Sequence, residues 1–310
     1  MTIRELLPED YEALFELYDG LLRLMPEQHA VGYEQFRRDL TRPHYSGPRD
    51  ALDPRADRAL VAVEQGRAVA LVLVGFIARE PRGAWEHEAP GRGVLRLVLA
   101  GPRDEDTARA LIREALAGLR RFRPKGYAAC LYRFGPRFHH KACARLPSAW
   151  PWVGHWLRLE GFEPVNAEVE MQAPLDTPPD RLPFPEGARL EEQPPEAEHA
   201  HVQPDLLYRN RLVIGGQLAA ECFNHFTGLY VDGAGREVFH TDWLGVEETV
   251  RARGLGRAML RDALATACER GARTASLTTE ATNFRAQGLY RSERYRIVDV
   301  MWAFERPRGR

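Results

Sequence analysis

The chain has 310 residues, 44% of them apolar and 28% charged, a composition that can bury a core and excludes wholesale disorder, collagen and coiled coil. With 43 Lys and Arg against 44 Asp and Glu, the net charge of −1 creates no global field that would recruit nucleic acid or anionic lipid. The longest apolar run, residues 68–78, is too short to cross a bilayer, and the acidic start of the chain is unlike a secretory signal peptide. We therefore expect a cytoplasmic protein without membrane or nucleic-acid partners.

The four cysteines lie far apart, and none forms the C-x-x-C pair of a zinc or redox site. We expect buried thiols. The irregular stretch 133–151 holds His139, His140 and Cys143, but adjacent histidines point in different directions on most backbones, which disfavours metal binding. We interpret this stretch as a loop that contacts substrate or the other half of the chain, and we expect no metal.

At about 150 residues per domain, the length predicts two domains. Seven prolines between positions 174 and 195 remove backbone donors and block both helix and central strand, which indicates a linker. We place a first domain at 1–173, a Pro-rich linker at 174–187 and a second domain at 188–310. A short strand and a proline-started helix begin on either side of this linker, at 3–10 and at 188–196, so a weak internal repeat is indicated.

Hydrophobic periodicity and turn residues predict the elements of the first half. In chain order they are a helix at 11–24, a hairpin of 59–63 and 68–77 turning at Gln65-Gly66, a strand at 94–100, a helix at 104–122, a strand at 127–132 and a helix at 152–160.

The second half predicts a similar order. It gives a helix near 196–208, strands at 212–214, 217–226 and 238–246, a helix at 254–270, a strand at 274–279, a helix at 283–292 and a strand at 297–304. Antiparallel hairpins followed by alternating strands and helices are typical of an α/β fold with one mixed, mainly antiparallel sheet in each half, flanked by helices.

Residues 251–257 read Arg-Ala-Arg-Gly-Leu-Gly-Arg and lie between a predicted strand and a strongly amphipathic helix. Glycines let the backbone approach a ligand, and the free N–H groups at a helix N-terminus attract anions. The stretch is not the dinucleotide fingerprint, because Met259 stands at the third glycine, and it lacks the Gly-Lys-Ser/Thr ending of a triphosphate loop. From these residues alone, an anion site and a tight turn with solvated arginines both remain open.

The same stretch matches the [Q/R]-x-x-G-x-[G/A] motif and resembles the Gcn5-related N-acetyltransferases (GNAT). One strand later, residues 283–290 read Asn-Phe-Arg-Ala-Gln-Gly-Leu-Tyr and match that family's N-x-x-A-x-x-L-Y pattern. The resemblance covers about residues 190–304 and is sharpest from 244 to 290. It departs at Arg294-Tyr295, where the family usually has Gly-Phe. The two halves then resemble two tandem acyl-CoA N-acyltransferase domains.

This resemblance implies acetyl-CoA as cosubstrate. It places the pyrophosphate on the N–H groups of residues 253–257, with support from arginine charge and the helix dipole. It places the pantetheine arm along the backbone of residues 244–246, where two strands splay apart. Asn283 matches a family position that often bonds the arm, although a simple helix N-cap is an equal reading. The implied cofactor-binding residues are Leu244, Gly245, Val246, Arg251, Arg253, Gly254, Leu255, Gly256, Arg257 and Asn283.

Transfer to an amine requires an oxyanion donor and an acid for the departing thiolate. Tyr290 matches the family acid, and a phenol with an ordinary pKa near 10 is protonated at neutral pH. The alternative is a buried helix tyrosine whose hydroxyl reaches water. For the oxyanion, the resemblance implies the backbone N–H of Val246.

The general base is a separate question. His240 is similar in position to the glutamate that serves as base in histone acetyltransferases of the family, and strand alternation puts Asp242 on the same face. A packed or surface histidine, with ordered water accepting the proton, is the alternative. Glu221 on the neighbouring strand is a further candidate base, or a carboxylate that attracts a cationic amine.

The equivalent stretch of the first half, residues 101–106, replaces the glycine motif with Pro102 and three carboxylates. Proline has no N–H and carboxylates repel a pyrophosphate, so this half should not bind coenzyme A in the usual way. Leu157 stands where the family has its tyrosine. The first half is therefore expected to be a degenerate GNAT-like domain that supports the second.

These observations favour an N-acetyltransferase that moves an acetyl group from acetyl-CoA directly to a primary amine in a ternary complex, with its site in the second half. The acceptor is a small-molecule or peptide amine, and a monomer or a homodimer fits equally. Two alternatives stay open: a non-catalytic acyl-CoA-binding sensor with a protein partner, and an acetyltransferase similar to mycothiol synthase, whose acceptor is a cysteinyl sugar.

Overall fold

The structure is a computed structural model that describes residues 1–25, 30–41, 51–80, 88–131, 134–136, 138–139, 145–193, 206–229 and 231–307. Its contacts divide it into two compact units. One comprises Met1–Glu168 and Asp299–Arg310, and the other comprises Val169–Val298. The chain passes between the units twice, once within the strand β7 (Glu163–Pro174) and once within the strand β13 (Arg296–Pro307).

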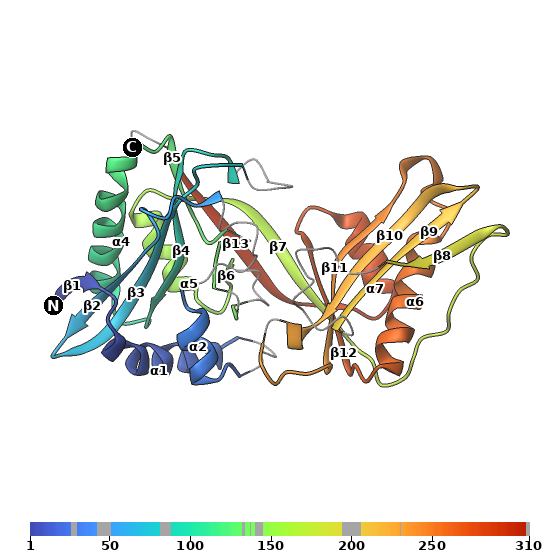
Figure 1. The fold of residues 1–310 in the computed structure, drawn as a ribbon, viewed down its shortest axis with the longest axis horizontal. Helices are drawn as coiled ribbons and strands as arrows, with labels where there is room; N and C mark the ends of the chain where they lie inside the picture. The colour runs from blue at the N-terminus through green and yellow to red at the C-terminus, as the bar shows by residue number, and fades with distance from the viewer. Residues whose placement is uncertain are drawn as a thin grey trace. The chain divides into compact units, whose positions relative to one another are not determined.

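The first unit is a sheet with helices packed against it (Figure 1). Its further elements are β1 (Thr2–Glu5), a 3-10 turn (Pro8–Asp10), α1 (Tyr11–Leu22), α2 (Tyr33–Asp39), β2 (Arg58–Glu64), β3 (Arg67–Phe76), β4 (Arg92–Ala100), α4 (Glu105–Leu119), a second 3-10 turn (Arg120–Phe122), β5 (Gly126–Ala129), β6 (Leu146–Pro147) and α5 (Pro151–Leu159). The strand order is β1-β2-β3-β4-β5-β13, and β6 also pairs with β13. All these pairs are antiparallel except β4 with β5.

Local sequence explains the first hairpin. Gln65 and Gly66 both have positive φ, 51° and 80°, which is the left-handed geometry of the two-residue turns that match strand twist. Beyond the turn, consecutive residues 70–74 of β3 are all at most 3% exposed, so both faces of this strand are covered. Helices α1 and α4 both pack on β3. The hairpin, with its turn, is confirmed as predicted.

His139 belongs to the stretch expected to form a loop that contacts substrate or the other half of the chain, but it is a core residue of the first unit. Its side chain stacks on Trp150 with ring centroids 5.2 Å apart, and Nδ1 lies 3.3 Å from the Tyr18 hydroxyl. Burial lowers the pKa of His139 to about 4. The described residues contain no cluster that could hold a metal ion, whereas His140 and Cys143 lie outside the described residues.

Because the His139 imidazole is buried, we expect the stability of the folded protein to decrease at acidic pH. Its folded pKa of about 4 lies below the unfolded value near 6.5, so the unfolded chain binds the extra proton as pH falls. Stability from this group is complete above pH 6.5 and declines towards pH 4, by up to about 3 kcal/mol in total. Urea unfolding followed by tryptophan fluorescence should show a weaker decline in His139→Gln. Equal declines in both proteins would contradict the assignment.

The second unit is also a sheet with helices packed on it (Figure 1). It contains β8 (Ala188–Glu192), β9 (Leu207–Ile214), β10 (Gln217–Phe226), a 3-10 turn (Thr227–Leu229), β11 (Val238–Val246), a further 3-10 turn (Glu248–Val250), α6 (Leu255–Glu269), β12 (Thr274–Glu280) and α7 (Phe284–Ser292). Its strand order is β7-β12-β11-β10-β9-β8. Strands β8 to β11 pair antiparallel, and β11 pairs parallel with β12.

Helix α6 packs on β10 and β11 through the apolar face that its sequence predicted. That face is buried and comprises Met259, Leu260, Ala263, Leu264 and Ala267. The predicted strands at 217–226 and 238–246 coincide with β10 and β11. A fold of mixed α and β elements with mainly antiparallel strands is therefore confirmed.

Three features differ from the sequence predictions. The twelve-residue strand β7 was not predicted, and β9 begins at Leu207 inside the segment expected to be a helix, whose residues 196–205 lie outside the described part of the chain. The compact units also differ from the predicted domains. The predicted second domain is 188–310, whereas residues 304–307 of β13 pair with β5 of the first unit. The place of β13 in the first unit depends on contacts between residues that are far apart in the sequence.

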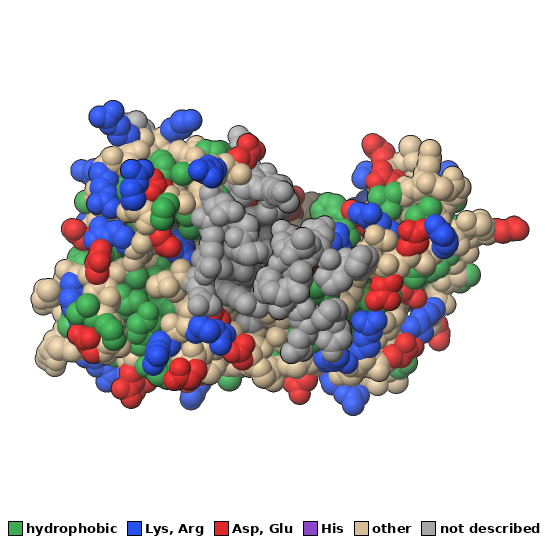
Figure 2. Space-filling model, viewed as in Figure 1, with side chains coloured by type: hydrophobic (Ala, Val, Ile, Leu, Met, Phe, Trp, Pro, Cys, Tyr) green, Lys and Arg blue, Asp and Glu red, His purple; other side chains and the backbone are tan. Residues whose placement is uncertain are grey.

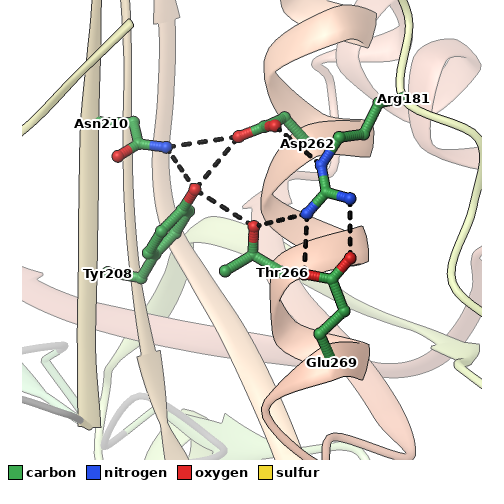
Figure 3. A network of polar contacts seen from close by, with 6 residues as sticks. All are labelled: Arg181, Tyr208, Asn210, Asp262, Thr266 and Glu269. Atoms are coloured by element: carbon green, nitrogen blue, oxygen red, sulfur yellow. Dashed lines mark hydrogen bonds and ion pairs between the residues drawn. The ribbon is translucent and has the colours of Figure 1, made fainter.

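The Pro-rich linker runs along α6 and is anchored there by Arg181 (Figure 3). Its guanidinium donates two hydrogen bonds to the Glu269 carboxylate, of 2.7 and 2.9 Å, and one to Asp262 at 3.2 Å. Asp262 also accepts from the Tyr208 hydroxyl on β9 at 3.1 Å. Burial is the main cause that raises the pKa of Tyr208 to about 12, so this hydroxyl stays a donor. The linker and the sheet are thereby joined through one helix.

Charge is mixed on the one face of the molecule that can be seen in Figure 2. On the face shown in Figure 2, basic and acidic side chains of the described residues are interspersed and form no extended field of one sign. This agrees with the net charge of −1. Among the described helices, none is both long and apolar enough to cross a membrane.

Candidate functional site

The sheet of the second unit opens beside the second half of β11. β11 pairs with β12 from Val238 to Thr241, whereas it stays paired with β10 as far as Val246. The register between β10 and β11 shifts at Phe223/Asn224, so that Asp242 has no opposite partner and forms a bulge. Beyond the bulge, one edge of β11 has no strand partner among the described residues. The predicted splay between these two strands is therefore present.

Backbone groups on this open edge point away from β10. The N–H of Glu247 donates to the Ala219 carbonyl of β10 at 2.9 Å. Because successive backbone groups of a strand point to alternate sides, the N–H groups of Leu244 and Val246 face the open edge. The Val246 carbonyl on that edge accepts a hydrogen bond from Arg251 Nε at 3.0 Å. The edge thus offers donors to an extended ligand.

A cleft of about 680 Å³ lies along this edge. Three parts of the second unit form its walls: the end of β11 with neighbouring β10 residues, the loop before α6, and one side of α7. It is lined by Leu218, Ala220, Glu221, Trp243, Leu244, Gly245, Val246, Glu247, Arg251, Ala252, Gly254, Leu255, Gly256, Arg257, Asn283, Arg285, Ala286, Leu289 and Tyr290. The volume lies within the range of small-molecule sites.

The loop before α6 is built to expose backbone N–H groups. Ala252 and Gly254 have positive φ, 63° and 81°, and Gly254 caps a helix of fifteen residues. An L-residue at Gly254 would strain the backbone, and the first N–H groups of α6 have no partner within the helix. At Gly256, a Cβ would come 3.5 Å from the Val246 side chain and 3.8 Å from that of Leu289. A larger side chain here would occupy the cleft.

Tyr290 lies in the cleft wall on α7 and is 7% exposed. Burial, with a smaller contribution from Cys222, raises the pKa of Tyr290 to about 12. The phenol is therefore a hydrogen-bond donor throughout the neutral range. Asn283 also lines the cleft, and its side chain accepts from the N–H of Ala286 at 3.2 Å as the N-cap of α7. The N-cap reading of Asn283 is thus correct, and the residue borders the cleft as well.

Among the predicted site residues, His240 and Arg253 are those that do not line this cleft. His240 is 3% exposed, and its Nδ1 lies 2.8 Å from the Ser276 hydroxyl on β12. Its Nε2 is 3.9 Å from Asp242 Oδ1, so the predicted proximity of these two residues is confirmed.

Sequence reasoning missed His225, which completes this group. Its Nδ1 lies 2.6 Å from the second carboxylate oxygen of Asp242, and its ring is 5.1 Å from that of His240. The pairing of His225 with His240 across β10 and β11 explains the proximity. The signal available in the sequence was that both strands carry one histidine, but their register could not be read without the structure.

Glu221, the predicted alternative, does line the cleft. Its carboxylate lies 3.6 Å from Arg211 Nε on β9, which reduces the negative charge it presents. Glu247 is a second carboxylate in the lining and was not predicted. The cleft wall therefore contains acidic groups near β11 and basic groups at the start of α6.

The first unit contains the same strand opening, but its own side chains occupy it. β4 pairs with β5 only from Arg92 to Leu95, which leaves the end of β4 open. The Trp152 indole N–H donates to the Ala100 carbonyl there at 3.0 Å. The Asp104 carboxylate accepts from the Gly101 N–H at 3.1 Å, just before α4. One backbone carbonyl and one backbone N–H of this opening are thus already hydrogen-bonded by side chains of the first unit.

Comparisons with known proteins agree with this geometry. Residues 177–294 match the acetyltransferase (GNAT) family. A GCN5-related N-acetyltransferase from Sphaerobacter thermophilus has a similar fold, with a TM-score of 0.67 at 15% identity over 99% of this chain and 95% of that one. A tandem GNAT protein from the clavulanic acid biosynthesis pathway gives 0.67 at 16% identity over 100% and 99%.

A GCN5-related glucosamine N-acetyltransferase region of a fungal multi-domain GH3 β-N-acetylglucosaminidase gives a TM-score of 0.69 at 13% identity, covering 98% of this chain and 38% of that one. No curated protein matches the sequence. At these identities the structural likeness establishes the fold. Residues 177–294 thus belong to the GNAT acetyltransferase family, within a chain that has the fold of a tandem GNAT protein.

Proposed function

We propose that this protein is an N-acetyltransferase that uses acetyl-CoA, with one working site in the cleft of the second unit. The observation that carries the proposal is the cleft itself. The open edge of β11, the glycine loop before α6 and Tyr290 on α7 border one continuous space. An extended amide arm, a pyrophosphate and a departing thiol each find the group their chemistry requires there.

The residues of the cleft fit acetyl-CoA part by part. Leu244 presents its backbone N–H to the extended arm, in the manner of an added strand, and Val246 presents its own to the thioester at the end of that arm. The N-terminus of α6 and the side chains of Arg251 and Arg257 favour an anion. Gly256 leaves open the space between β11 and α7 that any side chain would fill. When bound, acetyl-CoA supplies the thioester whose acetyl group is transferred, and coenzyme A leaves as the thiol.

Two groups of the chain donate hydrogen bonds to the reacting atoms in this proposal. The Val246 N–H donates to the oxygen that becomes negative as the amine attacks the thioester carbonyl. Tyr290, held protonated by its raised pKa, donates to the departing sulfur. These groups are fixed by a strand and a helix, so little reorganisation is needed at the moment of reaction.

His240 is the proposed proton acceptor. Because it is buried and does not line the cleft, it accepts the amine proton through ordered water. The Asp242 carboxylate, which lies 3.9 Å from His240 Nε2 and hydrogen-bonds His225, favours the imidazolium that forms. His240 and Val246 both lie on β11, so one strand carries the proposed base and the proposed oxyanion donor.

The experiment is an amine screen with thiol detection. The purified full chain is incubated with acetyl-CoA and primary amines of each class, including polyamines, amino acids, peptide N-termini, aminoglycosides and a cysteinyl sugar. The proposal expects release of free coenzyme A thiol with at least one class, and an acetylated product of the matching mass. Acetyl-CoA binding without turnover of any amine would favour the acyl-CoA sensor instead.

A further inference from the structure

A second, smaller cleft lies on the linker side of the loop before α6. It measures about 360 Å³ and is lined by residues 182–185 of the linker together with Arg253, Gly254, Leu255 and Ala258. Four consecutive residues, Leu-Pro-Phe-Pro, form one wall, and the start of α6 forms the other. This cleft was not predicted, and the proposed chemistry does not use it.

The two clefts meet at the loop. Gly254 and Leu255 line both of them. A ligand whose pyrophosphate lies on the N–H groups of this loop therefore extends into the larger cleft on one side and can enter the smaller one on the other. Coenzyme A has this order of parts: pantetheine, pyrophosphate, then 3′-phosphoadenosine.

We infer that the linker forms an adenosine-binding subsite for the cosubstrate, with Phe184 against the adenine ring. The inference rests on the proposed function. Phe184 is partly exposed within the small cleft, so its ring is accessible to a flat aromatic base. The exposed Arg253 guanidinium at the same cleft supplies charge for a phosphate group.

The linker is held in place for this role. The Arg181 guanidinium, directly before the cleft residues, makes its bidentate ion pair with Glu269 and a hydrogen bond to Asp262, both on α6. At the start of the linker, the Leu175 N–H donates to the Arg273 carbonyl at 2.7 Å. Pro183 and Pro185 restrict the backbone on either side of Phe184. A wall fixed in advance lowers the entropy lost on binding.

The α7 side of the loop before α6 provides a poorer surface for an adenine ring than the linker side does. The α7 side of the larger cleft is formed by Asn283, Arg285, Ala286, Leu289 and Tyr290, and the tyrosine is buried in the wall. Phe284 at the start of α7 is 75% exposed but does not line either cleft. It therefore provides a matched control, since Phe284→Ala removes the same ring on the opposite flank.

Calorimetric titration with two probes tests the inference. Acetyl-CoA carries the adenosine, and S-acetyl-4′-phosphopantetheine lacks it. We expect Phe184→Ala to weaken acetyl-CoA binding about tenfold and phosphopantetheine binding less than twofold. Phe284→Ala should change neither affinity. Arg181→Met, which removes the anchor, should weaken acetyl-CoA binding selectively and to a smaller extent.

Several results would overturn the subsite. They are equal affinity of the wild type for both probes, unchanged acetyl-CoA binding by Phe184→Ala, an equal loss for both probes, or a selective loss in Phe284→Ala. Phosphopantetheine binding by Phe184→Ala at wild-type affinity shows that the variant is folded. Failure of the wild type to bind either probe would instead refute the proposed function, so the two failures are distinguishable.

Discussion

Replacing Tyr290 with phenylalanine is expected to lower kcat about a hundredfold and to change acetyl-CoA affinity less than threefold. The ring stays in the wall between β11 and α7, so the shape of the cleft is kept, whereas the donor to the departing sulfur is lost. Steady-state kinetics with the best amine from the screen, together with calorimetry, separates these two effects. Unchanged kcat would remove Tyr290 from the mechanism.

Tyr295 provides the control for this variant. Its ring lies 5.8 Å from that of Tyr290, and its hydroxyl is buried without a hydrogen-bond partner in the described part of the chain. It does not line the cleft. Tyr295→Phe removes an equivalent hydroxyl and should leave kcat within threefold. A loss as large as that of Tyr290→Phe would mean that packing of this pair, and not proton donation, explains the effect.

The raised pKa of Tyr290 adds a pH test. Since the group titrates near 12, it remains protonated and able to donate up to about pH 11. A pH profile of kcat should therefore show no decline due to this residue between pH 8 and 10. A decline near pH 10 that is present in the wild type and absent in Tyr290→Phe would contradict the assigned burial effect.

Replacing Gly256 with glutamate is expected to lower acetyl-CoA affinity at least a hundredfold while the fold is kept. A Cβ at this position meets neighbours only at ordinary contact distances, and a carboxylate in the first turn of α6 is compatible with the helix dipole. The side chain would fill the cleft and repel the pyrophosphate. Calorimetry measures the loss, and circular dichroism checks the fold.

Gly288→Glu is the matched control. It adds the same side chain on α7, where the glycine is exposed, has open space at its Cβ and does not line the cleft. Acetyl-CoA affinity should stay within twofold of the wild type. If Gly256→Glu bound acetyl-CoA as tightly as Gly288→Glu, the cleft would not be the cosubstrate site. Gly254 is a poorer choice for this test, because its positive φ would add backbone strain.

Much of the site followed from local sequence. The loop at 251–257 and the helix at 283–292 lie where their motifs predicted, since glycine conformation, helix capping and apolar periodicity act over a few residues. The splay of β11 from β12 followed from the resemblance. Within the cleft, Tyr290 and the open edge of β11 lie as predicted.

What the sequence did not predict depends on contacts between distant segments. β7 alternates Val169 and Met171 with Glu168 and Glu170, a pattern typical of a strand with one exposed face, yet all four side chains are buried. His225 lies next to Asp242 through the pairing of β10 with β11, whose register shifts at a bulge between the two strands. The position of the linker wall depends on the ion pair of Arg181 with α6. No local sequence pattern indicates this contact. Trp152 occupies the strand opening of the first unit through another contact between distant segments.

The central claim is one acetyl-CoA site per chain, formed by the second unit. Calorimetric titration of the purified protein with acetyl-CoA tests it most directly, because the stoichiometry reports both halves at once. We predict one site in the wild type and none in Gly256→Glu. Two sites would show that the opening filled by Trp152 and Asp104 can still accept the cosubstrate, and no site in the wild type would contradict the proposed acetyl donor.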